Sequence, residues 1–247
     1  MVRNIGKLHF CLLLCSLFAS TLLAKQVDIV SPKGKLRAEI VIDQHVSVQI
    51  FNNGEKTFEI KDIYLDTDQG FIPKKKPSLR SVKKRRVDEI VRPEIKEKNS
   101  QIADCYNEVA LTFSDKTKLE VRLYDNGMAY RMSTNRKGDL TIYDEFADFI
   151  FPSASTLYFQ QDANMNSDYE APYVSKKIQD IEVGATGNYP ALVKTPTGTN
   201  ILLLESDLQD YPCLWLEKGN EHLNAHFWKY PKTYNVDGNS KNRRKIT

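Results

Sequence analysis

The chain has 247 residues, of which 41% are hydrophobic, 10% aromatic and 27% charged, and its formal net charge is +3. This composition excludes an intrinsically disordered chain, because the apolar content is high and the net charge is small. Eleven glycines, ten prolines and four cysteines exclude collagen-like chains and small disulfide-stapled folds. The remaining class is a globular protein with one large domain or two small ones.

The first 24 residues have the pattern of a secretory signal peptide. Arg3 and Lys7 give a basic start, and residues 8–24 (LHFCLLLCSLFASTLLA) carry no charge. We predict export to the periplasm or the exterior, with removal of residues 1–24 and a mature chain of residues 25–247. An uncleaved membrane anchor is the alternative, but this apolar run is short for a span of about 20 residues, so we expect no stable membrane span.

Short segments with alternating apolar and polar residues dominate the mature chain. This alternation is typical of strands with one buried face, and no window of 12 or more residues keeps apolar residues at helical spacing. The turn sequence Asp125-Asn126-Gly127 lies between two such segments and predicts a hairpin. The predicted strands are Leu36–Ile42, His45–Phe51, Glu108–Phe113, Leu119–Tyr124, Met128–Met132, Phe146–Phe151, Leu157–Phe159, Asn200–Leu204 and Leu214–Leu216. They predict an all-β fold, a large antiparallel β-sandwich in a single domain.

Two stretches interrupt this pattern. Residues 74–92 contain nine lysines and arginines against two acidic residues and have no aromatic residue. A nucleic-acid-binding patch would normally include aromatic side chains, so we interpret the stretch as an exposed loop or hairpin tip and expect no nucleic-acid partner. Residues 237–247 are polar and basic with no predicted strand, as expected where a longer chain has been cut before a further domain.

Cysteines and histidines give no clear site. Cys105 and Cys213 are the two cysteines of the mature chain, and the sequence leaves open whether they are bonded or free thiols. His222 and His226 lie in a segment that reads as a strand, where residues four apart are about 13 Å from each other, so we do not expect them to share a metal ion. No catalytic signature is present, and we assign no catalytic residue to this chain.

The segment 161–173 (QDANMNSDYEAPY) is the best candidate for a binding loop. Side-chain oxygens occur at every second position, in Asp162, Asn164, Asn166, Asp168 and Glu170, and such oxygens suit Ca²⁺. The spacing is not that of an EF-hand, because Ser167 and Tyr173 stand where that loop needs Gly and Glu. Asx turns in a polar loop are the simpler alternative. Tyr169 and Tyr173 flank Glu170, which fits a sugar site and a packed loop equally well.

Several segments, in the same order, resemble the N-terminal domain of glycoside hydrolase family 97, a family of exported bacterial α-glycosidases. They cover residues 31 to about 216, although the region before Tyr106 lacks tryptophans that members often carry. The segments are Ser31-Pro32-Lys33-Gly34-Lys35-Leu36, Tyr106-Asn107-Glu108, Leu123-Tyr124-Asp125-Asn126-Gly127-Met128-Ala129-Tyr130-Arg131, Asp168-Tyr169-Glu170-Ala171-Pro172-Tyr173 and Leu204-Glu205-Ser206-Asp207-Leu208-Gln209-Asp210-Tyr211.

The resemblance implies a galactose-mutarotase-like super-sandwich that precedes a catalytic (β/α)₈ barrel. The catalytic carboxylates would come from that barrel, and the N-terminal domain would lend one glutamate to a Ca²⁺ in the active site. By match to the family's loop, Glu170 would be this metal ligand, and Tyr169 and Tyr173 would be candidate substrate-binding residues. Glu205 is a rival for the calcium role, although its place in an apolar segment favours a buried structural hydrogen bond.

Three hypotheses follow from these observations. In the first, the chain is the N-terminal domain of a calcium-dependent α-glucosidase or α-galactosidase, which contacts an α-linked oligosaccharide and its own catalytic barrel but is not catalytic alone. In the second, it is a stand-alone exported carbohydrate-binding or scaffolding module. In the third, it is an unrelated β-sandwich with no sugar function.

Overall fold

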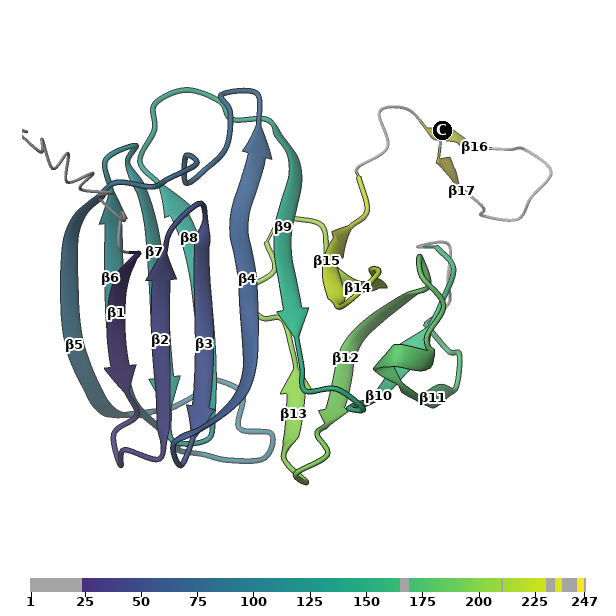
Figure 1. Cartoon of the computed structure of the whole chain (residues 1–247), viewed down its shortest axis with the longest axis horizontal. Helices are drawn as coiled ribbons and strands as arrows, with labels where there is room; N and C mark the ends of the chain where they lie inside the picture. The colour runs from purple at the N-terminus through teal and green to yellow at the C-terminus, as the bar shows by residue number, and fades with distance from the viewer. Residues whose placement is uncertain (1–23, 165–168, 210, 230–233, 237–243, 247) are drawn as a thin grey trace, which may run out of the picture.

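Two antiparallel sheets form the molecule in a computed structural model that describes residues 24–164, 169–209, 211–229, 234–236 and 244–246 (Figure 1). Among these residues the single helical element is a three-residue 3₁₀ turn at Ile178–Asp180. The all-β class predicted from the alternating segments is therefore confirmed. No helix long and apolar enough to cross a bilayer was found in the part of the chain that the structure describes.

The large sheet contains eleven strands. Ten of them follow one path, and β13 (Asn200–Leu203) pairs with β12 beside it. In spatial order the path is β1 (Lys25–Val30), β2 (Leu36–Ile42), β3 (Val46–Asn52), β4 (Glu55–Thr67), β9 (Ile142–Ile150), β15 (Leu223–Phe227), β14 (Leu214–Lys218), β12 (Thr186–Lys194), β10 (Thr156–Gln161) and β11 (Tyr173–Lys177). Neighbours such as β4 and β9 are far apart in sequence, so this sheet is assembled from both ends of the chain.

The small sheet contains four strands in sequence order. They are β5 (Leu79–Val91), β6 (Ile102–Phe113), β7 (Thr117–Tyr124) and β8 (Gly127–Thr134). The turn between β7 and β8 lies at the predicted position, with Tyr124 opposite Gly127. A separate short pair is formed by β16 (Tyr234–Val236) and β17 (Arg244–Ile246).

Apolar side chains from both sheets meet in one core. In each of β2 and β3 three alternate residues are buried, which is the pattern their alternating sequences predict. β7 contributes Leu119, Val121 and Leu123 from the opposite sheet in the same way. Burial of these alternate positions fixes the register of the strands, because a slip of one residue would turn the whole apolar set outwards.

Some expectations need correction. Most of the basic stretch 74–92 is not a loop, because residues 79–91 form β5, the outermost strand of the small sheet. The charged side chains suit that position, since lysines and arginines on an edge strand oppose pairing with other chains. The tail expected to lack a strand contains β17. The predicted signal peptide, residues 1–24, lies almost wholly outside the described residues and stays a prediction.

Candidate functional site

The loop between β10 and β11, residues 162–172, is tied to the large sheet at both ends. Near its start, the hydroxyl of Thr186 donates to the carbonyl of Asp162, and the Asp162 amide donates back to the Thr186 carbonyl at 3.1 Å. Near its end, the buried amide of Gln160 donates to the carbonyl of Ala171 at 2.6 Å. These anchors position the predicted calcium loop on the rim of β10 and β12.

Tyr169 packs against the sheet beneath the loop. Its ring meets the fully buried indole of Trp215, on β14, edge to face with the ring centroids 6.0 Å apart. Partial burial raises the pKa of the Tyr169 hydroxyl, and the neighbouring thiol of Cys213 acts in the same direction. About half of the side chain is nevertheless exposed, so Tyr169 both anchors the loop and presents a ring surface to solvent.

The side chains of Glu170 and Tyr173 differ in whether their polar groups are hydrogen-bonded. Glu170 is exposed, and its carboxylate has no hydrogen-bond or ion-pair partner among the described residues. Tyr173 opens β11 with its side chain 54% exposed, and its hydroxyl donates to the carbonyl of Pro190 at 2.9 Å. The ring of Tyr173 is therefore held in place, whereas the Glu170 carboxylate stays available for an external ligand.

The described part of the chain does not by itself contain the ligands of a calcium site. No group of three or more His, Cys, Asp or Glu side chains that could hold a metal lies among the described residues. The Asp162 carboxylate accepts a hydrogen bond from the amide of the next residue, Ala163, at 2.8 Å. Asn166 and Asp168 lie outside the described residues. Ca²⁺ takes six to eight oxygen ligands, so a calcium site that included Glu170 would need most of its ligands from elsewhere.

A row of aromatic and amide side chains that includes Trp215, the ring that Tyr169 contacts, was not predicted. Asn188, Trp215 and His226 lie opposite one another on β12, β14 and β15. His226 is 2.7 Å from Glu217 through Nδ1, and its ring meets Trp228 at 4.5 Å. Two of these residues are the chain's two tryptophans, which are the only sequence signal that marks the row. The row meets the loop where the ring of Tyr169 contacts Trp215.

The histidine and cysteine expectations can be checked directly. His226 lies in a strand, as predicted, and His222 immediately precedes that strand. They contact different carboxylates, since His222 is 3.9 Å from Asp148 whereas His226 pairs with Glu217. Cys105 and Cys213 are both free thiols and are partly buried.

A second carboxylate group lies at the end of β13. Glu205 follows β13 instead of lying inside it, and it is exposed, so its predicted burial is wrong. Its carboxylate does make a structural hydrogen bond, because it accepts from the amide of Leu214 at 3.0 Å. Nearby, the carboxyl of Glu145 on β9 accepts from the Tyr211 hydroxyl at 2.8 Å. Burial raises the pKa of Glu145, and the charges of Glu205 and Asp144 raise it further.

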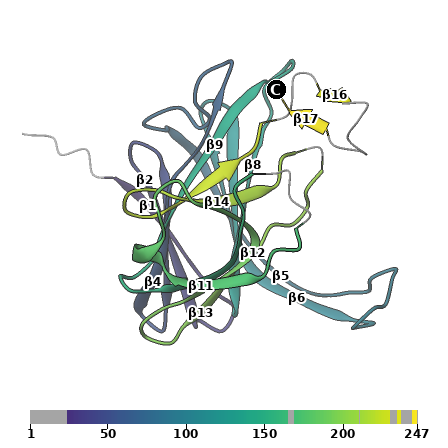
Figure 2. The ribbon, with the colours of Figure 1, turned by 90° about the vertical axis from the view of Figure 1, so that its right-hand side faces the viewer.

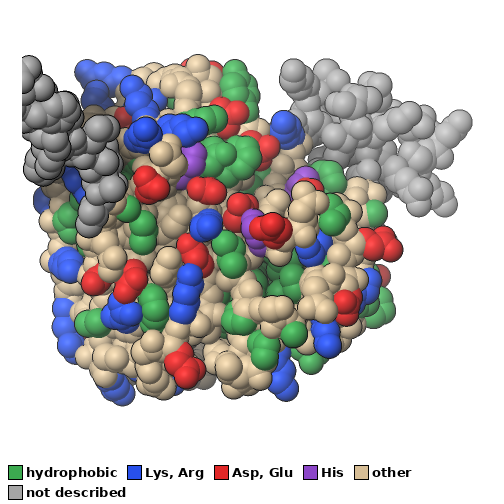
Figure 3. Space-filling model, in the orientation of Figure 1, with side chains coloured by type: hydrophobic (Ala, Val, Ile, Leu, Met, Phe, Trp, Pro, Cys, Tyr) green, Lys and Arg blue, Asp and Glu red, His purple; other side chains and the backbone are tan. Residues whose placement is uncertain are grey.

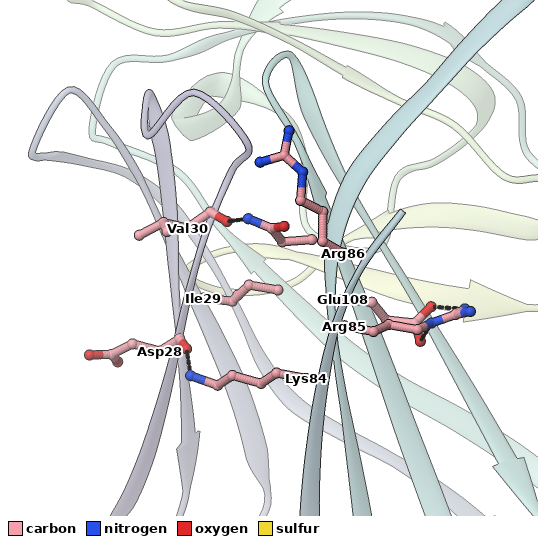
Figure 4. Close-up of a pocket in the computed structure, with 8 residues that line it drawn as sticks. Asp28, Ile29, Val30, Lys84, Arg85, Arg86 and Glu108 are labelled. Atoms are coloured by element: carbon pink, nitrogen blue, oxygen red, sulfur yellow. Dashed lines mark hydrogen bonds and ion pairs between the residues drawn. The ribbon is translucent and has the colours of Figure 1, made fainter. Parts of the chain in front are cut away.

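A cavity of about 380 Å³ lies between the edges of the two sheets, where β1 faces β5 and β6 (Figure 4). Its polar groups are bonded to each other: Lys84 donates to the carbonyl of Asp28 at 2.6 Å, and Asn107 donates to that of Val30 at 2.8 Å. Neither this cavity nor one of about 350 Å³ lined by Asn52 and several threonines includes the Glu170 loop. The face in Figure 3 mixes positive and negative side chains without a large area of one sign, in keeping with the small net charge.

Comparison with known proteins identifies the family to which this chain belongs. A family model described as "Glycosyl-hydrolase 97 N-terminal" matches residues 29–242. A retaining alpha-galactosidase of Bacteroides thetaiotaomicron is 30% identical over 238 residues, which cover 92% of this chain and 36% of that protein.

The fold is shared with solved structures. A glycoside hydrolase family 97 enzyme from Pseudoalteromonas sp. strain K8, in complex with acarbose, superposes with a TM-score of 0.72 at 17% identity. The match covers 81% of this chain and 32% of that one, and a variant of the same enzyme in complex with panose matches equally well. The chain thus spans about a third of the length of these relatives.

Proposed function

The chain belongs to the family of glycosyl hydrolase 97 N-terminal domains, and from this membership we propose that it is the β-sandwich domain of a calcium-dependent α-glycosidase. The observation that carries the proposal is the family match over residues 29–242 together with the exposed carboxylate of Glu170, which has no partner among the residues that the structure describes. In this role the domain lends a metal ligand and part of the sugar pocket, and the catalytic carboxyl groups belong to a barrel that longer relatives carry.

Glu170 is suited to complete a calcium site that another domain begins. The loop that holds it is anchored by Gln160 and Thr186, so the carboxylate is presented from a fixed base. A hard divalent cation prefers such oxygen ligands and needs more of them than this loop provides. When bound, Ca²⁺ would orient substrate hydroxyl groups and stabilise negative charge beside the reacting bond.

Tyr169 and Tyr173 are proposed to contact the sugar. Both rings are about half exposed, and both are held in position, by Trp215 and by the Pro190 carbonyl respectively. Aromatic rings present flat apolar surfaces, and carboxylates such as Glu170 accept hydrogen bonds from hydroxyl groups. The named relatives act on or bind α-galactosides, acarbose and panose, so we propose an α-linked oligosaccharide as the ligand and the periplasm or exterior as the location.

A calcium titration of a two-domain enzyme tests the metal role. In a fusion of residues 25–247 to the catalytic part of the Bacteroides relative, Glu170→Gln should lower calcium affinity at least tenfold by calorimetry. It should also lower activity at limiting calcium. Glu182→Gln is the matched control, because Glu182 is another exposed glutamate that lies outside the loop. Equal calcium affinity for the two variants would remove Glu170 from the site.

The stand-alone alternative predicts a different result. If residues 25–247 without any catalytic domain bound panose with an affinity that Tyr173→Ala abolished, an independent carbohydrate-binding module would be the better description. Absence of such binding, with calcium-dependent activity in the fusion, would support the two-domain proposal.

A further inference from the structure

The small sheet continues beyond the sandwich as a two-stranded arm, here defined as residues 87–106 (Figure 2). Residues 87–91 of β5 pair with residues 102–106 of β6, but the pairing of β6 with β7 stops at Asn107. Among the residues that the structure describes, no third strand therefore pairs with the arm. An isolated two-stranded hairpin is marginally stable in water, so an arm of this kind gains stability from a surface that covers it.

The base of the arm is held by ring, ionic and hydrogen-bond contacts. Tyr106 is 3% exposed, and the Arg122 guanidinium lies over its ring at 4.6 Å. Beneath it the buried Glu108 accepts hydrogen bonds from Arg85 at 2.6 Å and from Arg122 at 2.9 Å. The hydroxyl of Tyr124 donates to Asp104 at 3.2 Å. This network holds the arm in one direction, which reduces the ordering cost of docking.

The far part of the arm exposes apolar side chains. Ile90 is 49% exposed, Val91 41%, Ile102 47% and Ile95, in the connecting loop, 76%. Val91 and Ile102 are directly opposite each other, so they form a continuous apolar surface across both strands. Apolar groups gathered at the end of a projecting element are typical of a contact surface.

The face of the arm that carries Val91 and Ile102 also carries two carboxylates without a neutralising positive charge among the described residues. Glu89 and Asp104 are directly opposite each other, and each lies two residues nearer the base of the arm than Val91 and Ile102. Like charges that are directly opposite destabilise a pair of strands. Among the described residues neither has an ion-pair partner. By contrast, Glu120 on this face of the sheet pairs with both Lys118 and Arg131. The missing cation is the charge that a complementary surface would supply.

We propose that this arm docks on the catalytic domain of the longer family members, where a basic side chain bordered by apolar residues receives Glu89 and Asp104. The proposal rests on the two-domain function above. The length of the relatives favours this occupant, because they carry about twice as much additional chain as the part matched here. A second copy of this chain is less favoured, since the arm's two carboxylates, of Glu89 and Asp104, would face the same two carboxylates on the other copy.

Hydrogen exchange of the arm tests the proposal. Backbone amides of residues 87–91 and 102–106 should exchange at least tenfold more slowly in the fusion enzyme than in residues 25–247 alone. Glu89→Lys is the decisive variant, because it has opposite effects in the two settings. In the isolated chain it places opposite charges across the strands and should slow exchange, whereas in the fusion it should repel the docked cation and cancel the added protection. Glu55→Lys, an exposed glutamate on β4, should change neither measurement.

Several results would overturn the docking proposal. The first is an equal hydrogen-exchange rate of the arm in the isolated chain and in the fusion. The second is slower exchange of the Glu89→Lys variant than of the unaltered protein in both of these settings. The third is separate unfolding of the two domains of the fusion. A concentration-dependent dimer of residues 25–247 that Glu89→Lys dissolves would assign the surface to a second copy instead. If the arm fails these tests while Glu170→Gln still weakens calcium binding, the proposed function stands without the docking surface.

Discussion

Glu108 illustrates how a buried charge is stabilised at the residue scale. Its side chain is 4% exposed, and the hydrogen bonds from Arg85, followed by that from Arg122, lower its pKa to about 2. A pKa that folding depresses stabilises the folded state above the unfolded value near 4.5, and this contribution is lost as the pH falls towards 2.

We therefore expect Glu108→Gln to change the acid stability of the protein. Between pH 6 and pH 2.5 the free energy of unfolding of the unaltered chain should fall by about 2 kcal/mol more than that of the variant. Partial exposure of both arginines to solvent limits this difference. Urea unfolding at several pH values measures this slope. Glu97→Gln, at an exposed position, should keep the original slope, and parallel curves for all three proteins would contradict the assignment.

Glu145 should behave in the opposite way. Burial raises its pKa, so the folded state holds the proton more tightly than the unfolded chain, and stability is lost as the pH rises from about 4.5 through the raised value. Glu145→Gln keeps an oxygen for the Tyr211 hydroxyl but removes the charge. We expect this variant to be more stable than the unaltered protein at pH 8 and to lose that advantage at pH 4.5. Thermal unfolding of both proteins at the two pH values measures this difference in stability. If the variant were destabilised equally at both pH values, the charge of Glu145 would not be the cause.

At the scale of elements, strands were predictable where one face is buried. β2 was predicted at its observed bounds, and β7 and β8 within a few residues, because alternate burial requires alternate apolar residues. β5 escaped detection because an edge strand can carry charges on consecutive residues. β12 was missed since Gly187 and Pro190 interrupt its apolar pattern.

The same reasoning explains what was and was not predictable at the site. The composition of residues 161–173 indicated candidate metal ligands because the side chains that carry the oxygen atoms all lie in one short segment of the sequence. The contact of Tyr169 with Trp215 joins a loop to a distant strand, so no local pattern indicates it. The exposed position of Glu205 depends on where β13 ends, and strand ends are the least certain part of a prediction from sequence.

Gly187 gives a prediction for the strand that supports the loop. A Cβ at this position would overlap the ring of Phe159 and lie 2.9 Å from the carbonyl of Gln160, which is backbone and cannot move freely. Gly187→Ala should therefore destabilise the protein by about 2–3 kcal/mol, as other overpacked core substitutions do. Gly127→Ala is the control, because nothing lies within 4 Å of its added Cβ. Denaturant midpoints compare the two, and equal shifts would show that β12 tolerates a side chain there.

For the molecule as a whole, the first strand closes one open side of the sandwich. β1 pairs with β2 in the large sheet, while its carbonyl groups at Asp28 and Val30 accept hydrogen bonds from Lys84 and Asn107 of the small sheet. Ile29 is 5% exposed and belongs to the shared core. The strand therefore links the two sheets where their edges face each other (Figure 4).

Removal of residues 25–30 should consequently weaken both sheets together. Loss of Ile29 burial alone removes about 2 kcal/mol, and β2 becomes a long unprotected edge that can pair with other chains. We expect a lower unfolding midpoint and increased light scattering relative to the chain that lacks only residues 1–24. Ile29→Ala separates the two effects, because it loses the buried side chain but keeps β1 over the edge of β2, so it should lower the midpoint without added scattering. A truncated chain that matched this variant in both measurements would show that β1 contributes only its side chain and does not protect the edge of the sheet.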